Sequence, residues 1–189
     1  MLDVTELSSA AYAKMHITLP ESGVQLEVML VDAQHMPGCF GAYYKAPAEP
    51  TSSIVISSAA RAARSTFVHE LGHALHDAFD SSFETESNEF LEGVATTIER
   101  LHDGANCCMS DGKLVTLLRQ YHWTYWRYDD VVARMCEIRN GESFGMLLWE
   151  RIRQDVYYAD SIISEAYATL FGEHWCTDSE LRRMGRCST

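Results

Sequence analysis

The sequence has no long hydrophobic run, and this absence excludes one class of architecture. Its longest purely aliphatic stretch spans only residues 28–31, whereas a transmembrane helix needs roughly 20 consecutive apolar residues. Residues 1–10 contain neither the basic start nor the apolar stretch that marks a secretory signal. We therefore expect a cytoplasmic protein that does not enter a membrane.

Basic side chains are also scarce. The chain carries 15 Lys and Arg residues against 27 Asp and Glu residues, which gives a formal net charge of −12. Nucleic acids and anionic membrane surfaces repel a chain of this charge, so neither is an expected partner. Peptides and proteins of neutral or basic character remain as the expected partners.

The cysteines lack the spacing of a structural framework. Six are present, but none forms a Cys-x-x-Cys pair, and Cys107 and Cys108 are adjacent. A chain of 189 residues, 47% of them hydrophobic, can bury a core of its own and does not need disulfides to fold. We expect reduced thiols in a single domain.

Strand patterns come first and helical patterns follow, which predicts an α+β fold. In the first third, β-forming residues are bounded by Pro and Gly turns, and afterwards apolar residues recur at helical spacing. The expected domain covers residues 1–189, mainly β over 1–58 and mainly α over 59–175, with a tail at 176–189. The expected strands are 24–32, 39–45 and 52–57, and the expected helices are 59–79, 87–101, 113–127, 129–139 and 143–173.

A pentapeptide in the first expected helix carries a metal-binding pattern. His69, Glu70 and His73 fit the motif His-Glu-x-x-His. Positions four apart on a helix differ by only about 40° around its axis, so the two imidazoles project together and can bind one ion. Glu70 lies about 100° from His69, within reach of a water on that ion. Zinc accepts imidazole ligands and is catalytic when three protein ligands leave one position for water.

A carboxylate on the next expected helix supplies the third ligand. Residues 74–91 separate His73 from Glu92, and a helix that turns back across the first can place one carboxylate at the ion. Two histidines and one glutamate form a known catalytic zinc set. Glu89 shares the helical face of Glu92 and stays open as the alternative ligand.

Residues near the motif exclude one related zinc-binding pattern and include candidates for supporting the metal ligands. The extended metzincin pattern is excluded, because Phe79 stands where its third histidine would be. His76 lies two turns beyond the first motif histidine, so we expect it beside the ligands or toward the substrate. Asp77 and Glu99 are candidates for holding the imidazoles, since metal-bound histidines usually donate their second N–H to a carboxylate. A surface helix that binds no metal is the simplest alternative.

Three segments resemble zinc peptidases of the gluzincin group. HELGHALH resembles the zinc-binding helix of the thimet oligopeptidase family, and EGVATTIE resembles the glutamate helix of the aminopeptidase N family. DVYYADSIISEAYATLF resembles the thimet-family helix that bears a Tyr-Tyr pair near the zinc. Together the segments cover about residues 65–101 and 143–172. The resemblance implies a reduced, zincin-like catalytic core with Zn²⁺ held by His69, His73 and Glu92.

The resemblance and the motif together predict a zinc-dependent peptidase. Glu70 is expected to act as general base, and a phenol of Tyr157 or Tyr158 is expected to stabilise the oxyanion. The two tyrosines lie about 100° apart on the expected helix, so at most one faces the ion. Tyr157 is favoured because it matches the first residue of the family's pair.

Two further segments bear on substrate binding. The strand pattern at 41–45 suits a sheet edge along which an extended peptide can lie. The aromatic-rich stretch at 117–130 suits packing of helices on the sheet more than a substrate groove. The alternative functions are a non-catalytic zinc-fold binding protein and a regulatory protease dedicated to one protein or precursor-peptide target.

Overall fold

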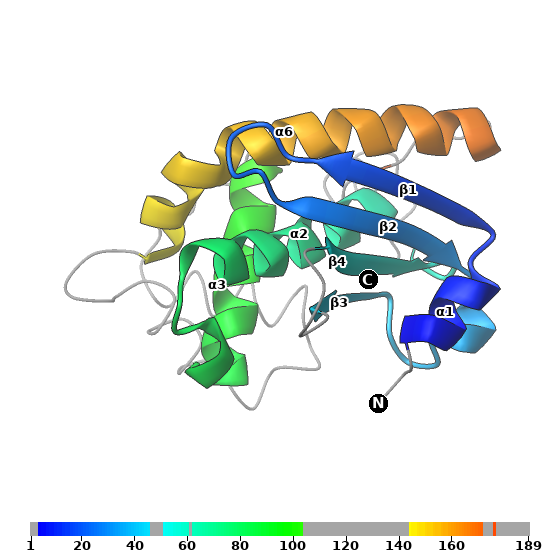
Figure 1. The fold of residues 1–189 in the computed structure, drawn as a ribbon, viewed down its shortest axis with the longest axis horizontal. Coiled ribbons are helices and arrows are strands. Elements are labelled where there is room, and N and C mark those ends of the chain that lie inside the picture. The colour runs from blue at the N-terminus through cyan, green and yellow to red at the C-terminus, as the bar shows by residue number, and fades with distance from the viewer. Residues whose placement is uncertain (1–3, 46–50, 61, 104–143, 172–175, 177–189) are drawn as a thin grey trace, which may run out of the picture.

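A computed structural model describes most of the chain (Figure 1). Outside the description lie residues 1–3, 46–50, 61, 104–143, 172–175 and 177–189, and the side chains of Glu89 and Phe171. The expected helices 113–127 and 129–139, the aromatic-rich stretch and nearly all of the expected tail fall in these ranges.

A four-stranded mixed sheet is formed by β1 (Ala13–Thr18), β2 (Gln25–Val31), β3 (Gly41–Lys45) and β4 (Thr51–Ser57). Its strand order is β1-β2-β4-β3. The central strands β2 and β4 run parallel, and β1 and β3 pair antiparallel at the two sides. The three strands expected from the sequence are therefore present, each within two residues of its expected limits.

The described helices are α1 (Val4–Ala10), α2 (Ala63–Phe79), α3 (Asn88–His102) and α6 (Phe144–Phe171), with short 3₁₀ turns η1 (Ala33–His35) and η2 (Phe83–Thr85). The chain thus combines a sheet with helices, in agreement with the expected α+β class. The helices expected at 59–79, 87–101 and 143–173 are confirmed. No helix in the described part of the chain is long and apolar enough to cross a membrane.

Residues 4–18 form two elements that the sequence analysis did not assign, α1 and β1. In β1 the partly buried Ala13, Met15 and the buried Ile17 alternate with exposed polar residues, as in a strand with one face on a core. The alternation is weak because Ala13 and Met15 are also common in helices. The turn into β2 contains Gly23, whose φ of 72° favours glycine.

The central strands separate two cores because successive side chains point to opposite faces. Leu26, Val28, Leu30, Ile54 and Ile56 face α2, α3 and α6 in the larger core. Met29, Val31 and Val55 face the other way and pack with Leu7 of α1 and with Met36. The helices α2 and α3 are thereby held on one face of the sheet, where they carry the motif residues.

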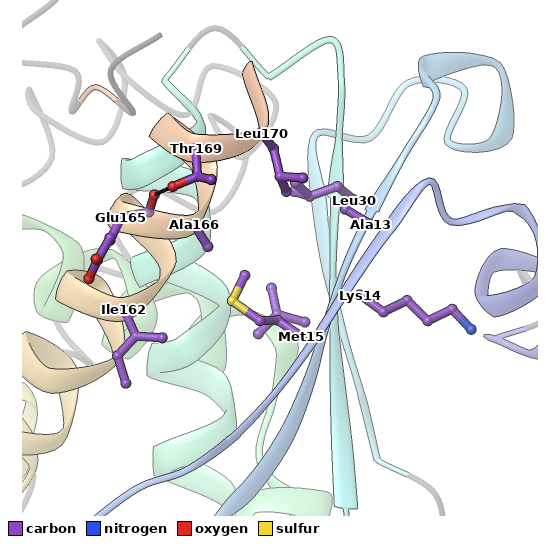
Figure 2. Close-up of a pocket in the computed structure, with 10 residues that line it drawn as sticks. Ala13, Lys14, Met15, Leu30, Ile162, Glu165, Ala166, Thr169 and Leu170 are labelled. Carbon is purple, nitrogen blue, oxygen red and sulfur yellow. Dashed lines mark hydrogen bonds between the residues drawn. The ribbon is translucent and has the colours of Figure 1, made fainter. Parts of the chain in front are cut away.

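A groove of about 420 Å³ opens between β1 and the C-terminal half of α6 (Figure 2). Its apolar lining includes Met15, Leu30, Ile162 and Ala166, and Figure 2 shows Lys14 extending away from the helix. The groove lies at the β1 side of the sheet, whereas the motif helix contacts β3.

Candidate metal centre

The motif lies in the buried half of α2. Phe67, Leu71 and Leu75 of this helix are fully buried in the larger core. His69, Glu70 and His73 are buried too, although the interior normally excludes such groups unless they are paired or bind an ion. A surface helix with incidental histidines does not match this burial.

A glycine inside the motif brings α3 close to α2. A Cβ added at Gly72 would stand 3.2 Å from the Cα of Ala95 and 3.4 Å from the Cβ of Ile98. Because glycine has no Cβ, the two helices approach more closely here than a side chain would readily allow. Because Glu92 lies one turn before Ala95 on α3, the close crossing carries its carboxylate to the histidines. The start of α3 is defined by Ser87, whose side chain accepts a hydrogen bond from the Phe90 N–H.

The three expected ligands come together at this crossing. Glu92 Oε2 lies 3.0 Å from His69 Nε2, and Glu92 Oε1 lies 3.7 Å from His73 Nε2. One ligand atom from each of the three residues lies within 4.8 Å of the other two. The side chain of Glu89, the alternative ligand, lies outside the described part of the chain.

One of the two carboxylates expected to hold an imidazole does so. Glu99 Oε2 lies 3.3 Å from His69 Nδ1, and the contact is buried. This contact leaves His69 Nε2 directed toward Glu92. The expectation for Asp77 is wrong, because its carboxylate accepts hydrogen bonds of 2.6 Å from the Tyr43 hydroxyl and 2.7 Å from Lys45 Nζ. Asp77 therefore ties β3 to α2 and does not hold a motif histidine.

The pKa values of Glu92 and His69 are shifted in the directions expected where a positive charge is stabilised. Burial raises the pKa of Glu92, but hydrogen bonds with His69 and His73 outweigh it, so the pKa of this carboxyl is lowered. Burial lowers the pKa of His69, but the hydrogen bonds with Glu92 and Glu99 outweigh it, so the pKa of this imidazole is raised well above its ordinary value. A divalent cation between these groups would take the place of the proton.

Glu70 stands apart from the ligand set and beneath the start of β3. Burial raises the pKa of its carboxyl, although His69 and His73 act in the opposite direction. A Cβ added at Gly41 would lie 2.8 Å from Glu70 Oε1 and 2.6 Å from Thr66 Cγ2. The strand therefore passes directly over the carboxyl group, and a side chain at residue 41 would force Glu70 or the strand to move. A buried carboxyl with a raised pKa is suited to accepting and returning a proton.

His76 does not have the place expected for it. It is fully buried, its Nε2 lies 3.3 Å from Asp80 Oδ2, and its ring packs against Phe83, Phe90 and Phe144. Aromatic packing and a local carboxylate contact account for this histidine. It belongs to the core that joins α2, α3 and the start of α6, not to a substrate-facing surface.

The structure does not bring the tyrosine pair to the cluster. α6 is one continuous helix, as expected, but Tyr157 and Tyr158 are 50% and 42% exposed. The Tyr157 ring lies 5.4 Å from the ring of His102, which stands about 15 Å along α3 from Glu92 at 1.5 Å per residue. The expectation that Tyr157 or Tyr158 faces the ion is therefore wrong for this structure.

The packing of α6 explains why the tyrosines point elsewhere. Ile152, Val156, Ala159 and Ile163 recur at helical spacing and are all buried in the larger core. This apolar stripe sets the rotation of the helix about its axis. Residues 157 and 158 then fall on the flank of the stripe, where side chains are partly exposed.

A second buried cluster was missed by the sequence analysis. Asp160 on α6 accepts two hydrogen bonds from Arg64, of 2.8 and 2.6 Å, and its Oδ2 lies 3.2 Å from His102 Nε2. Burial raises the pKa of Asp160, but the contacts with His102 and Arg64 outweigh it, so the pKa is lowered. The three residues come from α6, α2 and α3. No local pattern marks residues so far apart in the chain.

His69, His73 and Glu92, which together form the first cluster, have the ligand atoms that suit a zinc ion. Two imidazole nitrogens and one carboxylate oxygen form a catalytic zinc set, and zinc binds such ligands at about 2.0–2.2 Å. Both Nε2 atoms already face the same carboxylate, so small side-chain adjustments suffice to close the set around an ion. Comparisons with protein-family models, with curated proteins and with solved structures found no match to this chain.

Proposed function

We propose that this protein is a zinc-dependent peptidase of the gluzincin type, with a reduced, zincin-like core. The observation that carries the proposal is the convergence of His69, His73 and Glu92 within 4.8 Å, beside a buried glutamate that takes no part in the ligand set. A zinc ion that only stabilises a fold usually has four protein ligands, whereas a catalytic one has three and an open position. Among the described residues the set has three ligands, which favours a catalytic ion over a structural one.

The chain's own residues would divide the reaction between them. His69, His73 and Glu92 would hold Zn²⁺, with Glu99 fixing the His69 ring. When bound, zinc would supply Lewis acidity toward the substrate carbonyl and make water more acidic. Glu70 would accept a proton from the attacking water and return it to the leaving amine. The raised pKa of Glu70 suits this exchange, since a stronger base takes the proton more readily.

The strand β3 would guide the substrate. Among the described strands it is the last of the sheet on the α2 side, and an extended peptide can add to such an edge by backbone hydrogen bonds. Gly41 places the start of the strand over Glu70. Tyr43 and Lys45 anchor the strand to Asp77 on α2, so its distance from the proposed centre is held. A peptide, or an exposed segment of a protein, is the proposed substrate.

The test begins with the metal. Purified protein should contain one zinc per chain and should cleave members of a mixed peptide library. Glu70→Gln should keep the zinc and the fold and lose about 10²–10⁴-fold in turnover, the usual contribution of a general acid–base group. Unchanged turnover in this variant would sink the mechanism.

The same measurements separate the alternatives. Absence of zinc from protein prepared with added Zn²⁺ would overturn the metal centre itself. Zinc without cleavage of any library member would favour a non-catalytic binding protein. Cleavage restricted to one sequence would favour a regulatory protease with a single target.

A further inference from the structure

The second buried cluster joins three helices at one carboxylate. Asp160 of α6 is bound through both oxygens by Arg64 at the start of α2, and it also contacts His102 at the end of α3. The side chains of Asp160 and His102 are 5% and 3% exposed. Ser164, one turn further along α6, donates a further hydrogen bond of 3.3 Å to Asp160. The carboxylate is therefore fixed from several sides.

The two partners of Asp160 lie on the helices that carry the proposed ligands. Arg64 precedes His69 on α2 by five residues, about 7.5 Å of helix at 1.5 Å per residue. His102 follows Glu99 on α3 by three residues, just under one turn. The first cluster needs the spacing of α2 and α3 to be held, because its ligands come from both helices.

An ion pair with a buried carboxylate and a largely buried guanidinium is better suited to setting geometry than to adding stability. Desolvation of the charges offsets much of their attraction, so replacement of a whole buried pair by apolar residues is often neutral. What such a pair does impose is one arrangement of its partners, since a misplaced helix would leave a charge buried and unpaired. The planar guanidinium of Arg64 adds direction, because a two-pronged contact forms in only one orientation.

From this placement we infer that Asp160 is a positioning residue for the proposed metal centre. It fixes the start of α2 relative to the end of α3, and thereby the separation of His69 and His73 from Glu92. The inference rests on the proposed zinc site and does not depend on which substrate is cleaved. It predicts that loss of the Asp160 carboxylate changes metal affinity although Asp160 touches no ligand.

The chain offers a matched control on the same helix. Asp155 of α6 is also fully buried, and its two oxygens accept hydrogen bonds of 2.9 Å from the backbone N–H groups of Glu21 and Ser22. These groups belong to the turn between β1 and β2, not to the ligand-bearing helices. Asp155→Asn therefore disturbs a buried carboxylate of α6 without loosening α2 from α3.

The experiment compares Asp160→Asn with Asp155→Asn in the full chain. Zn²⁺ affinity is measured by competition with a chromophoric chelator, and the Co²⁺-substituted proteins are compared by visible absorption, which reports ligand geometry. Both are recorded at a temperature where circular dichroism shows each variant fully folded. Asp160→Asn should weaken Zn²⁺ binding about tenfold, the lower end for groups that orient ligands from behind, and should alter the Co²⁺ spectrum. Asp155→Asn should change neither.

A second pair of variants covers the case in which Asp160→Asn does not fold. His102→Gln keeps an N–H donor for Asp160 and should retain wild-type Zn²⁺ affinity, whereas His102→Ala should weaken it by a similar factor to Asp160→Asn. Equal affinities for all folded variants and the wild type would overturn the inference and leave the metal centre intact. An equal loss in Asp155→Asn would likewise reduce Asp160 to a stabilising residue. A wild type that binds no Zn²⁺ would overturn the proposed function first, and the inference with it.

Discussion

Two histidine–carboxylate clusters connect α2 with α3, one directly and the other through Asp160 of α6, and they differ in the residues that complete them. At Asp160 the carboxylate is matched by Arg64, whose guanidinium is always charged and cannot bind a metal. At Glu92 the partners are two imidazoles, which can each be neutral and offer a lone pair to a metal. The first arrangement is complete as it stands. Among the residues that the structure describes, the second has three ligand atoms and no Lys or Arg beside Glu92.

The chemistry of the partners, and not their burial, is what distinguishes the structural cluster at Asp160 from the candidate metal centre at Glu92. Both clusters are buried, and both perturb the pKa of a carboxyl in the same direction. A lowered carboxyl pKa alone would therefore not have chosen between them. The identity of the cationic partner does, together with the additional buried carboxyl of Glu70 beside the first cluster. Substitutions in the two clusters should therefore differ in how strongly they weaken metal binding, and those in the Asp160 cluster should also change how stability depends on pH.

The largest expected effect is the loss of zinc from His73→Ala. Removal of one of three protein ligands should lower Zn²⁺ affinity by more than the ten- to hundredfold seen when only an outer partner is lost. Metal analysis after gel filtration should find zinc in the wild type and almost none in the variant. His102→Gln, a histidine substitution in the other cluster, serves as the control and should retain zinc. Full retention by His73→Ala would place the site elsewhere.

The next largest effect concerns stability at the Asp160 cluster. Asp160→Asn removes the charge that Arg64 and His102 contact, so the free energy of unfolding near neutral pH should fall. Because the Arg64 side chain is 27% exposed, the fall should be about 1–3 kcal/mol, at or below the lower end for a fully buried pair. Urea unfolding followed by circular dichroism measures the change. Glu150→Gln, a substitution of an exposed α6 carboxylate, should stay near wild type.

The pH dependence follows from the direction of the Asp160 pKa. A carboxyl whose pKa is lower in the folded than in the unfolded chain stabilises the fold above its unfolded pKa of about 3.9 and loses this contribution as pH falls through the folded value. The stability gap between wild type and Asp160→Asn should therefore narrow below about pH 4. A gap that stayed constant down to the acid unfolding of the wild type would contradict the lowered pKa.

The parts of the fold and of the candidate site that the sequence predicts are those that depend on residues close together in the chain. His69 and His73 lie four residues apart, so helical geometry alone predicts that they share a face. β2 and β4 were predictable because they are rich in β-forming residues bounded by turns. The pairing of Arg64 with Asp160 spans 96 positions, and no periodic pattern records such a contact.

The tyrosine pair shows a different limit of sequence reasoning. The resemblance of residues 155–171 to a known helix placed Tyr157 at the ion, but the orientation of a helix is set by its whole apolar stripe. Ile152, Val156 and Ile163 bury that stripe in the larger core, where α6 packs against α3 and α2. The same local sequence therefore presents its tyrosines to a different surface. A motif can predict correctly that a segment is helical, while the orientation of that helix depends on residues outside the motif.

A smaller effect is expected where β3 passes over Glu70. In Gly41→Ala the new methyl group would meet Glu70 Oε1 and Thr66 Cγ2, so Glu70 must rotate or the strand must move. Misplacement of a catalytic group by about 1 Å can cost on the order of 10²-fold, and we expect 10- to 100-fold in kcat because the flexible glutamate adjusts in part. Zinc content should not change. Ala42→Ser, the next residue and on the opposite face of the strand, should leave kcat unaltered.

The smallest expected effect comes from closing the gap between α2 and α3 in Gly72→Ala. The added Cβ would meet the backbone of Ala95 at 3.2 Å, and a backbone atom cannot rotate away as a side chain can, so the helices must separate by a few tenths of an ångström. Overpacking costs about 1–3 kcal/mol, while the better helix propensity of alanine returns up to about 1 kcal/mol. The net loss of stability should be about 1 kcal/mol.

Metal affinity distinguishes this separation from a general loss of stability. Because Glu92 and the histidines lie on opposite sides of the widened crossing, Zn²⁺ affinity in Gly72→Ala should fall a few-fold, less than the tenfold loss at the lower end for outer partners. Gly145→Ala crowds α3 from α6 instead: its Cβ would lie 2.7 Å from Thr97 Cγ2 and 3.0 Å from Thr97 Cβ, so α6 must shift away from α3. It should also lose stability, but it should keep wild-type affinity because α2 and α3 stay in contact. An equal fall in both variants would show that crowding of α3 from any side disturbs the centre, and the α2–α3 crossing would lose its special role.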